Sequence, residues 1–256
     1  MTWRTTVTLE LLPSPIHSTQ RGIAPAHHRC DDCPVRASAL CGSLNDEELV
    51  SLNRLGRRRI VQAGQIVSWA GDPASMFANV ISGALKITAL TVDGREQIVG
   101  LLFPGDFVGQ LFSDKTQLTV TAMVESDLCT YPRSAFEAML DAFPRLERTL
   151  LQRVLASLNE ARDRMLTLGR KTAQERVAGF IQYLAMRSGD VRADGTVDVI
   201  LPVNRTEMAD YLGLTIETIC RQLTRLRTMS VIAFGASPRD CRILDSEQLD
   251  YLANPI

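Results

Sequence analysis

Residues 203–226 read VNRTEMADYLGLTIETICRQLTRL, a pattern of two short helices separated by a glycine. Asn204 is suited to cap the first helix, with Glu207 three residues later as its capping-box partner. Gly213 can adopt the left-handed backbone conformation at which the chain reverses sharply. Thr215 can cap the second helix. The stretch therefore predicts a helix-turn-helix.

The second of these helices has one apolar and one polar face. Its apolar stripe consists of Ile216, Ile219, Leu223 and Leu226, and its opposite face carries Glu217, Thr218, Cys220, Arg221 and Arg225. The N-terminal part of such a helix meets base edges in the major groove. Arg221 can bond to guanine, Glu217 can accept from cytosine and orient Arg221, and Arg225 suits a phosphate contact. A solvated polar face is the alternative, but the paired caps and the glycine favour DNA binding.

The flanking sequence extends this motif into a domain over residues 171–256. A helix is expected at Thr172–Arg187, a hairpin around Val197–Leu201 and a last strand pair around Val231–Leu244, which together predict a winged helix-turn-helix. This region holds 10 Lys+Arg and 11 Asp+Glu, and the whole chain of 256 residues has a net charge of −1. The balance excludes a protein that coats nucleic acid by bulk charge and favours a sequence-specific dimeric binder.

A long helix is expected before this domain, over roughly residues 144–168 of a dimerisation segment at 144–170. Pro144 suits its first turn, and Gly169 is expected to end it. Apolar residues recur along it at steps of three and four, with charged residues between them. Packing on the chain's own barrel would also explain the pattern, but its length favours a homodimer seam. The predicted seam consists of Leu150, Val154, Leu158, Ala161 and Met165.

Residues 30–143 predict a sensor domain of a different kind. Seven short strands between about 58 and 135 are separated by turn signals such as Asp93-Gly94, which is typical of an antiparallel barrel or jelly roll. An arm at 30–57 precedes them, and residues 1–29 are expected to form a flexible tail. The fold class is therefore α+β: an N-terminal antiparallel β-roll, a long dimerisation helix and a C-terminal winged helix-turn-helix.

Three of the six cysteines lie within the arm, as Cys30-x2-Cys33-x7-Cys41. Cys129, in a predicted strand, is the natural fourth member of a ligand set. Both structural zinc and an iron–sulfur cluster use such thiolates, and the spacing does not decide between them. His27 and His28 could serve zinc or be solvated tail residues. Cys241 is expected to be a core residue.

Two classes of protein are excluded by what the sequence lacks. The N-terminus has no signal-peptide core and no window approaches a membrane span, so we expect a cytoplasmic protein whose thiols stay reduced. All three histidines precede residue 29, so the barrel lacks the histidines of a cupin-like metalloenzyme. We therefore expect no enzymatic activity.

Taken together, these motifs resemble the CRP/FNR superfamily of transcription regulators, and within it the oxygen-sensing FNR branch. The likeness extends over residues 27–250 and includes two runs, LLFPGDFVG at 101–109 and TAQERVAGF at 172–180. The resemblance implies that Cys30, Cys33, Cys41 and Cys129 ligate a [4Fe-4S] cluster. It also implies that the intact cluster favours dimerisation, that the dimer binds a palindrome of the TTGAT…ATCAA type through Glu217 and Arg221, and that it recruits RNA polymerase, mostly as an activator. Oxygen would convert the cluster to [2Fe-2S], loosen the dimer and release DNA.

The sequence departs from the pattern of the family it resembles at Cys220 and in the seven-residue spacing before Cys41. The FNR pattern has serine where this chain has Cys220, and FixK-like relatives suggest that a cysteine near the DNA can act as an oxidation switch. Cyclic-nucleotide-binding members hold the phosphate with an Arg-Ser pair, but residues 109–118 contain no arginine and have Lys115 as their one cation. We therefore expect no cyclic nucleotide as a ligand. A CRP-like regulator with structural zinc or a small-ligand sensor domain is the alternative to the iron–sulfur protein.

Overall fold

The structure, a computed structural model, describes residue 30 and residues 32–254. The predicted flexible tail at 1–29, with His27 and His28, lies outside the described residues. Among the described residues, no helix has the length and apolar character needed to cross a lipid bilayer.

The β-roll consists of two four-stranded antiparallel sheets, in the orders β1-β8-β3-β6 and β2-β7-β4-β5. Because successive side chains of a strand point to opposite faces, one set of residues in β3 faces the interior of the roll and the other set faces the arm. Its strands are β1 (Arg57–Val61), β2 (Ile66–Ser68), β3 (Met76–Ser82), β4 (Leu85–Leu90), β5 (Glu96–Leu102), β6 (Phe107–Val108), β7 (Thr119–Ala122) and β8 (Ser126–Pro132).

The arm precedes the roll and contains two short helices. Residue 30 and residues 32–44 form turns and the 3-10 helix η1 (Leu40–Ser43), and α1 (Asp46–Leu55) follows. Asn45 caps α1, and its side chain and that of Glu48 form a capping box. Leu49 and Leu52 are buried on the inner face of α1. The local sequence thus sets where the arm ends and where the first strand begins.

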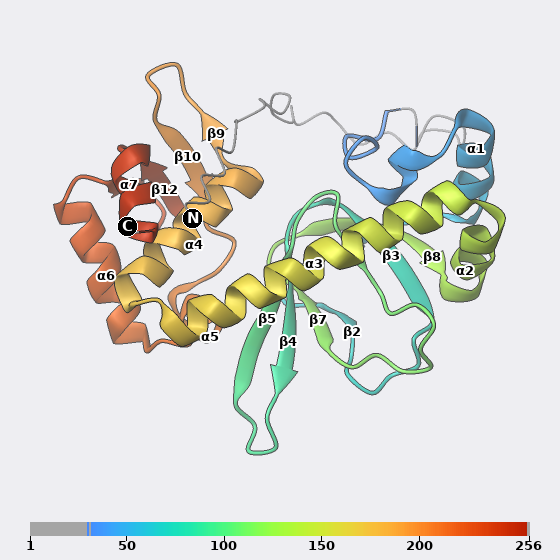
Figure 1. Cartoon of the computed structure of the whole chain (residues 1–256), viewed down its shortest axis with the longest axis horizontal. Helices are drawn as coiled ribbons and strands as arrows, with labels where there is room; N and C mark the ends of the chain where they lie inside the picture. Colours follow the sequence, from blue (N-terminus) through green and yellow to red (C-terminus); the bar gives the residue numbers. More distant parts are fainter. Residues whose placement is uncertain (1–29, 31, 255–256) are drawn as a thin grey trace, which may run out of the picture.

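The long helix α3 (Pro144–Arg170) follows α2 (Arg133–Ala142) and runs across the roll toward the C-terminal domain. Figure 1 shows the arm and α2 near one end of α3 and the C-terminal helices near the other. The prediction that Gly169 ends the helix is wrong, because α3 continues to Arg170 and Lys171 is its C-cap. Gly169 is exposed with no atom near its Cβ direction, so no packing contact requires a break there.

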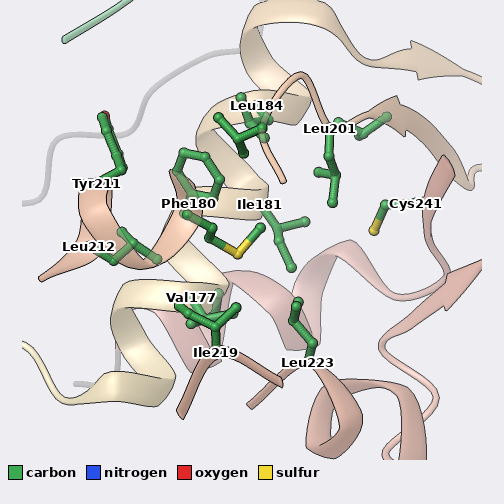
Figure 2. Close-up of a cluster of buried hydrophobic side chains, with 14 of the residues drawn as sticks. Val177, Phe180, Ile181, Leu184, Leu201, Tyr211, Leu212, Ile219, Leu223 and Cys241 are labelled. Atoms are coloured by element: carbon green, nitrogen blue, oxygen red, sulfur yellow. The ribbon is translucent and has the colours of Figure 1, made fainter. Parts of the chain in front are cut away.

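The C-terminal domain has the predicted winged helix-turn-helix architecture. Gly213 lies between α5 and α6 with φ 61° and ψ 43°, the left-handed conformation that the turn requires. Figure 2 shows the core beneath the motif, a buried cluster that includes Phe180 and Ile181 of α4 together with Ile219 and Leu223 of α6. Its elements are α4 (Ala173–Ser188), β9 (Asp190–Val191), β10 (Val197–Ile200), α5 (Arg205–Leu212), α6 (Ile216–Thr228), β11 (Ile232–Phe234), β12 (Asp240–Ile243) and α7 (Ser246–Ala253).

The C-terminal domain is docked on the roll through an apolar contact with charged edges. Ile98 and Phe103 of the roll belong to the same buried cluster as the core of the C-terminal domain. At one edge, Arg187 of α4 pairs with Asp106 and lies over the Phe103 ring, 5.3 Å from its centroid. At the other, Lys86 of β4 pairs with Glu207 of α5. The orientation of the helix-turn-helix is therefore tied to the roll.

Candidate functional site

The four predicted ligand cysteines line one cavity. Cys30, Cys33 and Cys41 come from the arm, and Cys129 comes from β8. All four side chains are half-buried. Two segments that are nearly ninety residues apart in the sequence thus bring their thiols together, as the ligand hypothesis requires.

The electrostatics of this cavity disfavour several thiolates at once. Burial, followed by the neighbouring charges of Cys33, Cys30 and Cys129, raises the pKa of Cys41 to about 12. Cys129 donates its S–H to the Tyr131 hydroxyl at 3.1 Å, and burial together with Cys129 raises the pKa of Tyr131. Four thiols in such a place ionise together only with a compensating positive charge, which bound metal supplies.

The cavity also has a polar wall that the sequence did not point to. Asn79 of β3 is 2% exposed and lines the cavity, and its Oδ1 atom has no hydrogen-bond partner. Arg58 lines it as well, and its Nε donates to both carboxylate oxygens of Asp127, at 3.0 and 3.1 Å. An orphaned buried amide and a nearby guanidinium suit an anionic, sulfur-rich group, so the residues present fit an iron–sulfur cluster.

The spacing of the thiols bears on the zinc alternative. Within the described part of the chain, no three His, Cys, Asp or Glu side chains converge closely enough to hold a single metal ion. The cavity among the cysteines has a volume of about 30 Å³.

The arm contacts the long helix directly. Arg153 of α3 donates a hydrogen bond to the backbone oxygen of Ser38, between Cys33 and Cys41. Leu40 of η1 belongs to the same buried cluster as Leu146 and Leu150 of α3. The cysteine arm is therefore in direct contact with α3, the helix for which the sequence predicts a role in dimerisation.

An apolar stripe of α3 is exposed, and it differs in part from the predicted seam. Val154, Leu158 and Met165 are 46%, 44% and 71% exposed, and Ala161 is also exposed. Leu150 differs from them because its side chain is buried against η1 and α2 of its own chain, and its part in the seam stays a prediction. The periodicity missed three further exposed residues on this side of the helix, namely Leu151, Leu155 and Leu166.

The predicted DNA-reading residues lie on α6, and most of them are exposed. Glu217, Cys220, Arg221 and Arg225 are exposed, and Thr218 is half-buried. Hydrogen bonds from its own backbone N–H and from Thr215 lower the pKa of Glu217, so this acceptor is ionised. Arg221 donates to the Thr218 hydroxyl at 3.4 Å, so in the described structure Thr218 rather than Glu217 is its partner.

Two cysteines of the C-terminal domain have different surroundings. Cys241 is 2% exposed and points into the core, as predicted (Figure 2), and burial raises its pKa to about 12. Cys220 is exposed beside a small hollow that Arg205 and Phe234 also line. Arg205 stacks over the Phe234 ring at 4.8 Å, which places a guanidinium next to the recognition helix. Sequence reasoning missed Arg205, although its position at the start of α5 was a signal.

A second cavity, of about 400 Å³, lies between the roll and α3. The cations that line it within the described residues are Arg153 and Arg187. Arg153 bonds to Ser38 and Arg187 to Asp106, so both already have partners in the chain. That a cyclic phosphate has no site here stays a prediction.

Both domains of the chain match known protein families. Residues 58–143 match the family model of a cyclic nucleotide-binding domain, and residues 175–252 match that of a Crp-like helix-turn-helix domain. The chain is 42% identical over 209 residues to the transcriptional activator protein FnrL of Cereibacter sphaeroides, covering 80% of this chain and 84% of that protein. It is 38% identical over 235 residues to the nitrogen fixation regulation protein FixK of Bradyrhizobium diazoefficiens, covering 90% and 96%.

A solved structure gives the same result for the fold. The structure of FixK2 from Bradyrhizobium japonicum superposes with a TM-score of 0.72 and 29% identity, covering 78% of this chain and 98% of that one. The relatives are transcription regulators, and the helix-turn-helix of this chain is a DNA-binding module rather than an enzyme's active site. With its β-roll, long helix and Crp-like helix-turn-helix, the chain belongs to the CRP/FNR family of transcription regulators.

Proposed function

We propose that this regulator is an oxygen-responsive transcription activator controlled by a [4Fe-4S] cluster held by Cys30, Cys33, Cys41 and Cys129. The observation that carries the proposal is the convergence of these four thiols on one cavity. The relative FnrL bears the name of a transcriptional activator, which supports activation as the output. The cluster, when bound, supplies a centre that reacts with oxygen and carries charge into the cavity.

The arm and α3 are the parts of the chain that connect this site to dimerisation. The Arg153–Ser38 bond and the packing of Leu40 beside Leu146 join the two. The position of the arm then sets how α3 presents its exposed stripe to a second copy of the chain. Burying Val154, Leu158 and Met165 against the same residues of a partner removes apolar surface from water and stabilises a homodimer.

In the dimer, two copies of α6 read the two halves of a palindrome. Arg221 bonds to guanine, Glu217 accepts from a cytosine amino group, and Arg225 contacts phosphate. The chain has almost no net charge, so the second half-site is required for useful affinity. Control of dimerisation is therefore sufficient to control DNA binding.

We place RNA polymerase as the protein partner and the cytoplasm as the compartment, since DNA and polymerase are both there. The loop at 113–117 is the candidate polymerase contact. Phe112, directly before it, is 75% exposed with a φ of 55°. A bulky residue with positive φ in an exposed loop is a strained arrangement that suits a contact role.

The proposal is tested by operator binding with and without oxygen. The full chain is purified anaerobically and titrated onto a fluorescent TTGAT…ATCAA duplex, before and after exposure to air. We expect tight binding before air and loss of binding after it. Cys129→Ala should bind weakly in both conditions, whereas Cys241→Ala, which lies in the C-terminal core, should respond to air like the natural chain. Equal binding by all three proteins in air and in its absence would contradict the proposal.

A further inference from the structure

The side chain of Asn79 is buried where packing alone calls for an apolar residue. It lies on β3 between Phe77 and Ile81, which occupy the same row of the strand and are 0% and 3% exposed. The opposite row, Ala78 and Val80, faces the interior of the roll. Both neighbours of Asn79 in its row are apolar, so the row itself gives no reason for an amide.

The ladder between β3 and β8 fixes where this amide points. Asn79 is paired directly with Cys129, within a register that also pairs Phe77 with Tyr131. Residues directly opposite each other in an antiparallel pair project to the same face of the sheet. Asn79 therefore projects beside the Cys129 thiol, and it lines the cavity that the four cysteines share.

The amide has hydrogen-bonding capacity that the chain does not use. Its Oδ1 atom is buried and has no partner, and a buried polar atom in that condition costs free energy. An amide can turn about its last torsion to present either its oxygen or its NH2 group. The thiolate and sulfide sulfurs of a cluster are acceptors only, so the NH2 group is the part of Asn79 that they would engage.

We propose that Asn79 is a positioning residue for the iron–sulfur site, donating a hydrogen bond from its amide to a sulfur of the cluster or of Cys129. This inference rests on the proposed function. Hydrogen bonds to the sulfurs help to set the reduction potential of such clusters, and groups around the ligands help to retain the metal. Asn79 thus raises the midpoint potential and slows cluster loss.

The test compares Asn79→Leu with the natural chain in two states. In the full apo chain, Leu replaces an unsatisfied amide by an apolar group of similar size, so the midpoint of urea unfolding should stay the same or rise. In the chain reconstituted anaerobically with ferrous iron and sulfide, the midpoint potential should fall. The chelator concentration that removes half of the cluster should fall about tenfold. A residue that only supports the fold cannot produce these opposite effects.

Two further variants sharpen the comparison. Asn79→Asp keeps the shape but adds a negative charge beside an anionic group, and it should retain the cluster least. Ile81→Val changes packing in the same cavity without changing polarity, and its midpoint potential should match that of the natural chain. The potential and the chelator curve follow the cluster itself, without a DNA-binding assay.

Three outcomes would overturn the inference. An unchanged potential and chelator curve in Asn79→Leu would show that the amide does not act on the cluster. An apo form of this variant that unfolds at lower urea would show a structural role. If the natural chain assembled no cluster, the proposed function would fall as well, whereas a normal cluster in both proteins would leave the proposed function standing and remove only the role of Asn79.

Discussion

The Nζ atom of Lys86 lies 3.2 Å from a carboxylate oxygen of Glu207, and this ion pair joins the β-roll to the first helix of the helix-turn-helix. The other carboxylate oxygen of Glu207 accepts the backbone N–H of Asn204 at 2.9 Å and completes the helix cap. Lys86 is also 3.2 Å from Glu96. One lysine therefore holds two carboxylates and links the start of α5 to the sensor domain.

Replacement of Lys86 by Met should weaken this docking. It leaves Glu96 and Glu207 facing each other without a cation, and both side chains of the Lys86–Glu207 pair are only 17% exposed. Combined with Glu207→Gln, which keeps an acceptor for the cap, a double-mutant cycle in urea unfolding should give a coupling of about 1–2 kcal/mol. A coupling below about 0.3 kcal/mol would show that the pair does not hold the domains together.

Leu158→Glu should convert the dimer into a monomer without unfolding the chain. Leu158 is 44% exposed on the apolar stripe, so the carboxylate is solvated in the monomer and buried only in the dimer. Sedimentation measures the mass, and circular dichroism the fold. Leu150→Ala is the matched control, because Leu150 is buried in its own chain and its loss should lower the stability of the monomer by about 2–5 kcal/mol. A Leu158→Glu protein that stays dimeric would place the dimer seam elsewhere.

Arg221→Ala and Arg225→Ala should weaken DNA binding in different ways. Loss of a base-reading arginine should cost about 1–3 kcal/mol per half-site on the palindrome and relax the preference at one base pair. Loss of a phosphate contact should weaken binding to all sequences and reduce the salt slope by about one per half-site. Binding isotherms on matched and mismatched duplexes at several salt concentrations separate the two. Identical behaviour of the two variants would refute the assigned roles.

The stability of the chain should depend on Cys241 at alkaline pH. Burial raises the pKa of this thiol from 9.0 to about 12, so between these values the unfolded chain has lost a proton that the folded chain retains. The free energy of unfolding then falls as pH rises, with a slope of up to ~1.4 kcal/mol per pH unit from this group. Urea unfolding of Cys241→Ala from about pH 8.5 to 10.5 should show a shallower fall. Cys220→Ala, at an exposed position, is the control and should follow the natural chain.

The helix caps and the turn glycine were predictable because their chemistry is local. Asn204 with Glu207 lies within one helical turn, and the left-handed conformation at Gly213 depends on the absence of a side chain. The fold class followed from such signals together with strand spacing. Gly169 shows their limit, because an exposed glycine ends a helix only when the chain turns there, and α3 goes on to Arg170.

The parts that escaped prediction depend on contacts between distant segments. Heptad spacing places Leu150 on the same face of the helix as Leu158 and Ala161. It does not tell which part of that face packs against the helix's own chain, where η1 and α2 bury Leu150. The position of Asn79 beside Cys129 follows from strand register, and that of Lys86 beside Glu207 from domain docking. No spacing rule within one segment contains either relationship.

The central claim is that Cys30, Cys33, Cys41 and Cys129 hold a four-iron cluster, and metal analysis tests it most directly. The full chain is purified without oxygen, and its iron, zinc and acid-labile sulfide are measured together with its visible absorption, before and after air. We expect about four iron and four sulfide per chain, with a brown absorption band that bleaches in air, and loss of all three in Cys129→Ala. A colourless protein that holds one zinc and no sulfide, unchanged by air, would contradict the account.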